Sequence, residues 1–330
     1  MRSAPRALFL SLALLVPALA AVDGTVMNST TGQPQPNAIV SLVQPGQGGM
    51  QTLASVRTDA QGKFRFDKDV PPGPILLQTL YLGVLYNQPV MPGSPSTGMR
   101  VQVYEATNKP GTAKVAQHFI VLQPSATELT VSEGVLYQGD PKVAYSDPVN
   151  GTFHFYLPPE AKGKVQVTIN SPGGMPIQRP AEKTKQANIY KIDYPIKPGE
   201  TRFDLNYVLP ATNPMTFSTK ILHTEGSSAL VAPQGVTLKG DNIELAGTEP
   251  TTQASIYRVK SDDITVQIEG TGALEQAGAA ASSQEDNGAP NIQEVKPRIY
   301  DRMYWILGMA FAVLALGSVL LYRSKPNTTA

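Results

Sequence analysis

Between residues 22 and 270, hydrophobic and polar side chains alternate with a period of two over many short segments. Successive side chains of an extended strand point to opposite faces, so this alternation predicts strands with one buried and one polar face. The clearest examples are residues 153–157, 165–169, 190–194, 203–209 and 264–268. Turn-forming segments rich in Pro, Gly and Asn separate them. This spacing predicts an all-β fold of sandwiches rather than a parallel sheet with crossover helices.

The N-terminus departs from this pattern. Two arginines precede an uncharged apolar run at residues 7–16, and Ala18-Leu19-Ala20 follows shortly after it. A positive segment, a short apolar core and a small-x-small site are typical of a secretory signal peptide. We therefore expect residues 1–20 to be a signal peptide and the mature chain to begin at Ala21. An uncleaved anchor is the alternative, but the run is short for a membrane span.

A second apolar run, without a charged residue, occupies residues 304–322. As a helix it would be about 28 Å long at 1.5 Å per residue, close to the hydrocarbon thickness of a bilayer. Tyr304, Trp305 and Tyr322 stand at its ends, where aromatic rings favour the membrane interface. We expect one C-terminal transmembrane helix here, in contact with the lipid bilayer. A buried core helix is disfavoured, because no other long helical stretch could bury it.

The orientation of the expected transmembrane helix follows from the signal peptide rather than from the flanking charges. Positive residues flank residues 304–322 on both sides, so the positive-inside rule does not decide it. An exported N-terminus would make this run a stop-transfer segment, with a cytoplasmic tail at 323–330 and an ectodomain in the periplasm or at the cell surface. Residues 271–303 are poor in large apolar side chains as far as about residue 297, which predicts a flexible linker.

The first quarter of the chain carries a distinctive turn. Asp59 can accept hydrogen bonds from backbone amides two residues on, and Gly62 can adopt a positive φ angle without a Cβ clash. Phe64 and Phe66 follow at strand spacing and are expected to enter one core face.

Together with its neighbours, this turn resembles the carboxypeptidase regulatory-like family, a prealbumin-type β-sandwich. The matching pieces are Gly24-x-Val26, the turn at 32–38 leading to Val40, and Thr58-Asp59-x-x-Gly62-x-Phe64-x-Phe66. The family usually continues with a Gly-x-Tyr-x-Leu strand, where this chain has residues 72–77 instead. The resemblance implies a non-catalytic accessory domain over residues 21–110, and some similar folds bind carbohydrate.

Residues 111–270 predict a second β-sandwich unit, as one domain or two small ones. The expected architecture is thus tandem β-sandwich domains of prealbumin or immunoglobulin type, plus the C-terminal transmembrane helix. Domains of this size can fold on their hydrophobic cores alone. This matters because the chain contains no cysteine, and therefore no disulfide or thiolate metal site.

Composition and motifs give little support to catalysis. The formal net charge is +1 without a basic cluster, which argues against a nucleic-acid partner. The three histidines, His118, His154 and His223, lie outside any zinc-site spacing. Two pairs of aspartates, at 67 and 69 and at 262 and 263, are better read as solvated turn residues than as a calcium site. We expect no catalytic residue, no metal and no cofactor.

One apolar stretch at residues 80–86 is hydrophobic on both strand faces. A central strand of the sandwich is the simpler interpretation. The alternative is that Tyr81 or Tyr86 faces outward and anchors a partner, because tyrosine is enriched at binding hot spots. The favoured function is a non-catalytic, membrane-anchored extracytoplasmic binding or scaffold protein of the cell envelope, with a protein or an envelope glycan as partner. A carbohydrate-binding module is the alternative, followed by a hydrolase with an unrecognised site.

Overall fold

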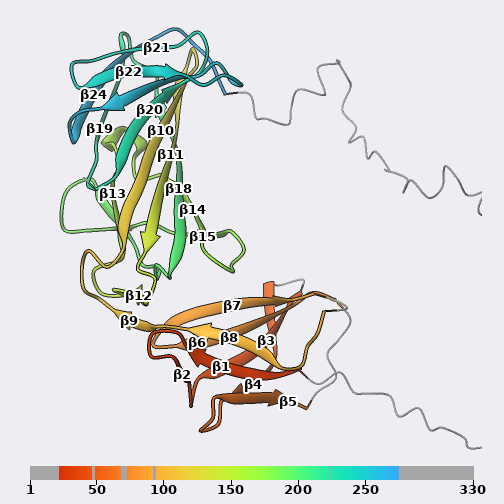
Figure 1. Ribbon diagram of the computed structural model, residues 1–330. Helices are drawn as coiled ribbons and strands as arrows, with labels where there is room; N and C mark the ends of the chain where they lie inside the picture. Colours follow the sequence, from red (N-terminus) through yellow and green to blue (C-terminus); the bar gives the residue numbers. More distant parts are fainter. Residues whose placement is uncertain (1–21, 47–48, 68–72, 92–93, 224, 275–330) are drawn as a thin grey trace, which may run out of the picture. The chain divides into compact units, whose positions relative to one another are not determined.

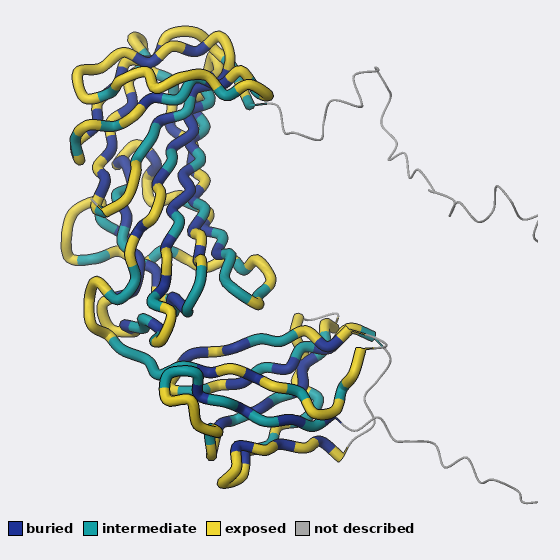
Figure 2. Tube along the Cα trace, in the orientation of Figure 1, coloured by how far each residue is buried: buried dark blue, intermediate teal, exposed yellow. Residues whose placement is uncertain are grey.

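The computed structural model describes residues 22–274, except residues 47–48, 68–72, 92–93 and 224. The described residues fall within one compact unit and form the strands labelled in Figure 1. Their buried side chains gather in two hydrophobic cores, which define a first and a second sandwich. Figure 2 shows the buried segments running along the strands, with exposed residues concentrated in the connections.

Several predictions fall on residues that are not described: the signal peptide at 1–20, most of the linker, the transmembrane helix at 304–322 with Tyr304, Trp305 and Tyr322, and the tail at 323–330. Within the described ranges, no helix has the length and apolar character needed to cross a bilayer.

The first sandwich consists of two four-stranded sheets. In one sheet the order is β2-β1-β5, and β8 pairs with β1 in parallel; in the other it is β4-β3-β6-β7. The strands are β1 Val22–Asn28, β2 Gln33–Pro34, β3 Ile39–Gly46, β4 Gly49–Arg57, β5 Lys63–Phe66, β6 Ile75–Tyr81, β7 Val84–Val90 and β8 Met99–Val103.

The predicted turn before β5 is confirmed. The Asp59 Oδ1 atom accepts hydrogen bonds from the amides of Gln61 at 2.9 Å and Lys63 at 2.8 Å. Gly62 has a φ angle of 72°. The turn directs Phe64 and Phe66 into the first core, where their rings meet edge to face. A short loop therefore fixes the face that β5 presents to the core.

A two-strand ladder joins the first core to the following chain. β9, at Glu105–Thr107, pairs in parallel with β12, at Val143–Tyr145. Ala144 of β12 is fully buried in the first core, while Tyr145 forms a bridge to Ile196 in the second sandwich. The segment around Ala144 therefore packs against both sandwiches.

The second sandwich consists of one eight-stranded sheet and two three-stranded sheets. The large sheet has the order β15-β14-β18-β11-β10-β20-β23-β22, and the small sheets have the orders β13-β17-β16 and β19-β24-β21. The strands are β10 Lys114–Pro124, β11 Glu128–Gly139, β13 Phe153–Tyr156, β14 Gln166–Asn170, β15 Ile177–Arg179, β16 Glu182–Lys183, β17 Ile189–Ile192, β18 Gly199–Pro210, β19 Met215–Lys220, β20 Ser227–Ala232, β21 Thr237–Lys239, β22 Ile243–Thr248, β23 Ser255–Val259 and β24 Asp263–Glu269, with a 3-10 turn η1 at Pro159–Ala161.

One continuous core fills the second sandwich. Buried residues from all three sheets belong to it, from Val115 on β10 to Ile268 on β24. The five segments with the clearest alternation coincide with β13, β14, β17, β18 and β24. The all-β prediction is therefore confirmed, and the buried side chains of these strands belong to a single hydrophobic core.

Candidate functional site: the β6–β7 hairpin

The hairpin between β6 and β7 turns through two residues in the left-handed region. Leu82 has a φ angle of 47° and Gly83 one of 77°. Two-residue loops with positive φ at both positions match the twist of the flanking strands, and Asn-Gly or Asp-Gly is the usual sequence. A leucine costs roughly 1–2 kcal/mol there, because its Cβ crowds the carbonyl oxygen. The side chain of Leu82 is nevertheless 52% exposed.

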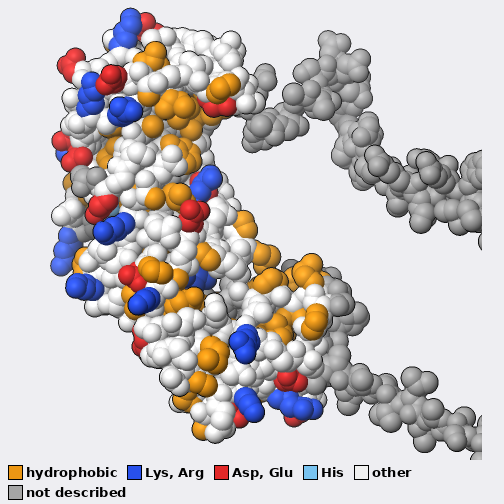
Figure 3. All heavy atoms as spheres, in the orientation of Figure 1, with side chains coloured by type: hydrophobic (Ala, Val, Ile, Leu, Met, Phe, Trp, Pro, Cys, Tyr) orange, Lys and Arg blue, Asp and Glu red, His pale blue; other side chains and the backbone are white. Residues whose placement is uncertain are grey.

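Two more leucines are exposed beside this turn. Leu80 on β6 and Leu85 on β7 are directly opposite each other in the ladder, and each is 41% exposed. Alternation explains their orientation, since Ile75, Leu77 and Thr79 of β6 point into the core. We call Leu80, Leu82 and Leu85 the leucine patch. Figure 3 shows that hydrophobic side chains are exposed on the visible face of this sandwich.

Tyr86 lies on the opposite face of the hairpin from the leucine patch. It is only 6% exposed, and its ring packs 6.1 Å from that of Tyr104. Its hydroxyl donates to the Tyr104 carbonyl and accepts from the Tyr104 amide, each at 3.2 Å. Burial raises the pKa of Tyr86 far above its usual value. This side chain therefore belongs to the first core.

Tyr81 is half-buried at the end of β6. Its hydroxyl donates to Glu105 Oε1 at 2.7 Å, and the same carboxylate oxygen accepts from the Asn28 side chain at 2.7 Å. Burial, and then the hydrogen bond to Glu105, raise the pKa of Tyr81 to about 12. Tyr81 thus helps to hold β9 against β1 and β6.

The central strand expected over residues 80–86 is wrong, because Leu82 and Gly83 form a turn between β6 and β7. The alternative, an outward Tyr81 or Tyr86, is not what the structure has either. The structure places both rings on the core side, and it exposes the leucines instead. The signal was present in the period of two, because an outward Leu80 implies an inward Tyr81. What the pattern could not show is which of the two apolar faces the rest of the chain covers.

A buried polar chain crosses three neighbouring strands of the second sandwich. His118 Nε2 on β10 lies 3.2 Å from Glu133 Oε2 on β11, and the Tyr207 hydroxyl on β18 donates to Glu133 Oε1 at 2.5 Å. All three residues are buried, and His118 Nδ1 has no hydrogen-bond partner among the described residues. Burial and the neighbouring Glu133 raise the pKa of Tyr207.

The other two histidines meet at the small sheet that contains β13. His223 Nε2 lies 2.7 Å from the His154 carbonyl oxygen, and its ring stacks on Phe153. Burial lowers the pKa of His223. The imidazole of His223 is therefore held as a neutral packing group, whereas His154 contributes its backbone.

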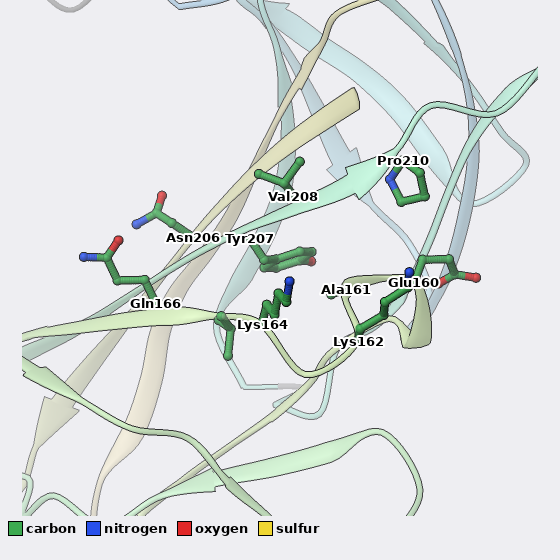
Figure 4. Close-up of a pocket in the computed structure, with 10 residues that line it drawn as sticks. Glu160, Ala161, Lys162, Lys164, Gln166, Asn206, Tyr207, Val208 and Pro210 are labelled. Atoms are coloured by element: carbon green, nitrogen blue, oxygen red, sulfur yellow. The ribbon is translucent and has the colours of Figure 1, made fainter. Parts of the chain in front are cut away.

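A groove of about 650 Å³ opens beside this core, between the η1 turn and β18. Figure 4 shows Glu160 and Lys162 arriving from the turn, and Tyr207 and Pro210 from the strand. Glu160 and Lys162 are exposed, so water solvates their charges. The Tyr207 hydroxyl is turned inward to Glu133. The groove therefore does not bring reactive groups together.

Comparison with known proteins bears on the first sandwich. Residues 21–103 match the family model of the carboxypeptidase regulatory-like domain, which confirms the resemblance deduced from the residues around Asp59. The match ends at the last residue of β8, so it covers both sheets of the first sandwich. A search of curated proteins found no match to this chain.

Proposed function

We propose that this chain is a non-catalytic, membrane-anchored binding protein of the cell envelope. Its ectodomain would lie outside the cytoplasm and hold a protein partner through the leucine patch. Residues 304–322 would anchor it in the bilayer, and the linker before them would let the sandwiches reach away from the membrane.

The observation that carries the binding role is the leucine patch. Isolated exposed leucines are common, but Leu80 and Leu85 are a directly opposed pair with Leu82 at the adjoining turn. Contiguous exposed apolar side chains favour burial against a partner. The left-handed backbone at Leu82 adds support, because strained residues that persist often serve a function.

The non-catalytic character is supported by the titratable side chains of the second sandwich, which hydrogen-bond or pack inside its core. Glu133 and Tyr207 satisfy each other inside the second core, and His223 packs against Phe153. The match of residues 21–103 points the same way, because domains of this kind are typically accessories to other proteins.

Partner binding can be tested by crosslinking the full chain in its native membrane and measuring what is recovered with it. Replacing Leu80 and Leu82 together by serine should lower recovery of the partner at least tenfold. Leu245→Ser is the matched control, because Leu245 on β22 is 59% exposed but lies in the other sandwich. Equal recovery with both variants, or substrate turnover by the purified protein, would contradict the proposal.

The placement can be tested separately in sealed, right-side-out vesicles. A protease added outside should digest the sandwiches, and one confined to the cytoplasmic side should leave them intact. Digestion from the cytoplasmic side alone would contradict an extracytoplasmic ectodomain.

A further inference from the structure

Lys197 is a buried cation at the free edge of the first sandwich. It is 5% exposed, and its Nζ atom donates to the carbonyl of Leu85 on the edge strand β7 at 3.2 Å. The ammonium group also lies 5.8 Å from the centre of the Tyr86 ring. Over the described ranges, Lys197 forms no ion pair with any carboxylate.

Leaving an ammonium group buried without an anion is costly. Attraction to a carbonyl and an aromatic face recovers only part of its lost hydration. Burial accordingly lowers the pKa of Lys197 to about 8. A methionine could fill the same space at less cost. An anion in the space beside Lys197 would complete its neutralisation.

A cavity of about 310 Å³ lies beside this ammonium group. Leu76 and Leu85 of the first sandwich line one side, and Met175 and Ile177 of the second line another. Arg179 on β15 adds a second positive charge, and none of the described residues that line the cavity is Asp or Glu. The walls are largely apolar, with Gln78, Asn87 and Tyr194 as the neutral polar side chains among them. The cavity thus combines mostly apolar walls with uncompensated positive charge, at the small end of the range of about 300–1,000 Å³ for ligand pockets.

We propose that this cavity binds a free medium-chain fatty acid. The carboxylate would pair with Lys197 in the field of Arg179, and the alkyl chain would lie along the leucine and methionine side chains. Charge complementarity selects an anion, and the apolar walls select one with a hydrocarbon tail. Leu85 belongs both to the leucine patch and to the cavity wall, whereas Leu80 and Leu82 do not line the cavity. The inference therefore does not depend on the leucine patch having a protein partner.

The test uses the full-length protein and a decanoate analogue that carries a photoactivatable diazirine on its chain, below the concentration at which it forms micelles. Irradiation should label peptides that contain Leu85 or Met175. Excess decanoate should compete for labelling at least tenfold better than decanol, which lacks the negative charge. Labelling should also fall several-fold between pH 7 and pH 9.5, as Lys197 loses its proton.

Variants make the assignment specific. Lys197→Met keeps the apolar stem and should lower labelling at least fivefold, and the exposed Arg179→Gln should lower it less. Lys63→Met is the control, because Lys63 is exposed on β5 and does not line the cavity. Equal competition by decanol, labelling elsewhere, or full labelling of Lys197→Met would overturn the proposal. Loss of the protein partner in the Leu80 and Leu82 variant leaves this result unchanged, so the two proposals fail separately.

Discussion

At the scale of single residues, the hairpin between β6 and β7 shows how a turn decides which apolar side chains are buried. The stretch at residues 80–86 is apolar throughout, yet the ladder sends Tyr86 inward and Leu85 outward. Leu82 occupies a position that favours glycine or asparagine. The local sequence is therefore not the most stable choice for the turn it forms.

Replacing Leu82 by asparagine should stabilise the protein. Asparagine tolerates the left-handed region much better than leucine, so we expect a gain of about 1 kcal/mol in the free energy of unfolding. For a protein of this size that corresponds to a rise of about 2–4 °C in Tm, measured by calorimetry. Leu245→Asn places the same change on an exposed leucine in a strand and should give no gain. A lower Tm for the Leu82 variant would show that the leucine side chain stabilises the turn.

At the scale of elements, local alternation predicted many strands and the Asp59 turn correctly, but it missed the turn at Leu82 and Gly83 and did not show how the strands pair. β1 pairs in parallel with β8, some seventy residues away in the chain, with Gly24 opposite Met99. A Cβ atom on Gly24 would lie 2.2 Å from the Met99 carbonyl oxygen and 2.9 Å from the Phe64 ring. The glycine that opens the family motif therefore permits the close approach of β8 to β1.

Replacing Gly24 by alanine should weaken the first sandwich. The new methyl group meets backbone atoms of β8 that cannot move without opening the ladder, so we expect a loss of about 1–3 kcal/mol. Protection of the β1 and β8 amides from hydrogen exchange should fall accordingly. The adjacent Thr25→Ala adds no atoms and should change stability by less than the Gly24 variant. Equal protection in both variants would show that β8 can shift at little cost.

At the scale of the whole molecule, residues distant in sequence connect the two sandwiches. β12 contributes Ala144 to the first core, and Lys197 donates to β7. These contacts bury one charged group that neither sandwich neutralises. Water hydrates the ammonium group of Lys197 in the unfolded chain, and burial removes this hydration in the folded protein. The charged form of Lys197 is therefore more stable in the unfolded chain.

The burial of Lys197 predicts a pH dependence of stability. Its pKa is about 8 in the folded protein, against an ordinary value of 10.5. Between these two values the unfolded chain binds more protons, so the contribution of Lys197 to stability rises with pH from about 8 to about 10.5. The difference of 2.5 pKa units, 10.5 minus 8, corresponds to roughly 3 kcal/mol.

Lys197→Met should therefore be more stable than the parent protein at pH 7 by up to roughly 3 kcal/mol, and this advantage should shrink as the pH approaches 10. Denaturant unfolding of both proteins across this range measures the difference. Comparing the two proteins removes the titration of all other groups. A difference that stays constant with pH would contradict the low pKa.

The residues by themselves determined the fold class, the Asp59 turn and the identity of the first domain. These features depend on side-chain alternation and on turn chemistry, which act over a few neighbouring positions. Only the tertiary structure decided that Tyr81 and Tyr86 face inward, that Gly24 lies against Met99 and that Lys197 is buried. Each of these results from contact between segments far apart in the chain, and the period of two is the same whichever face another segment covers.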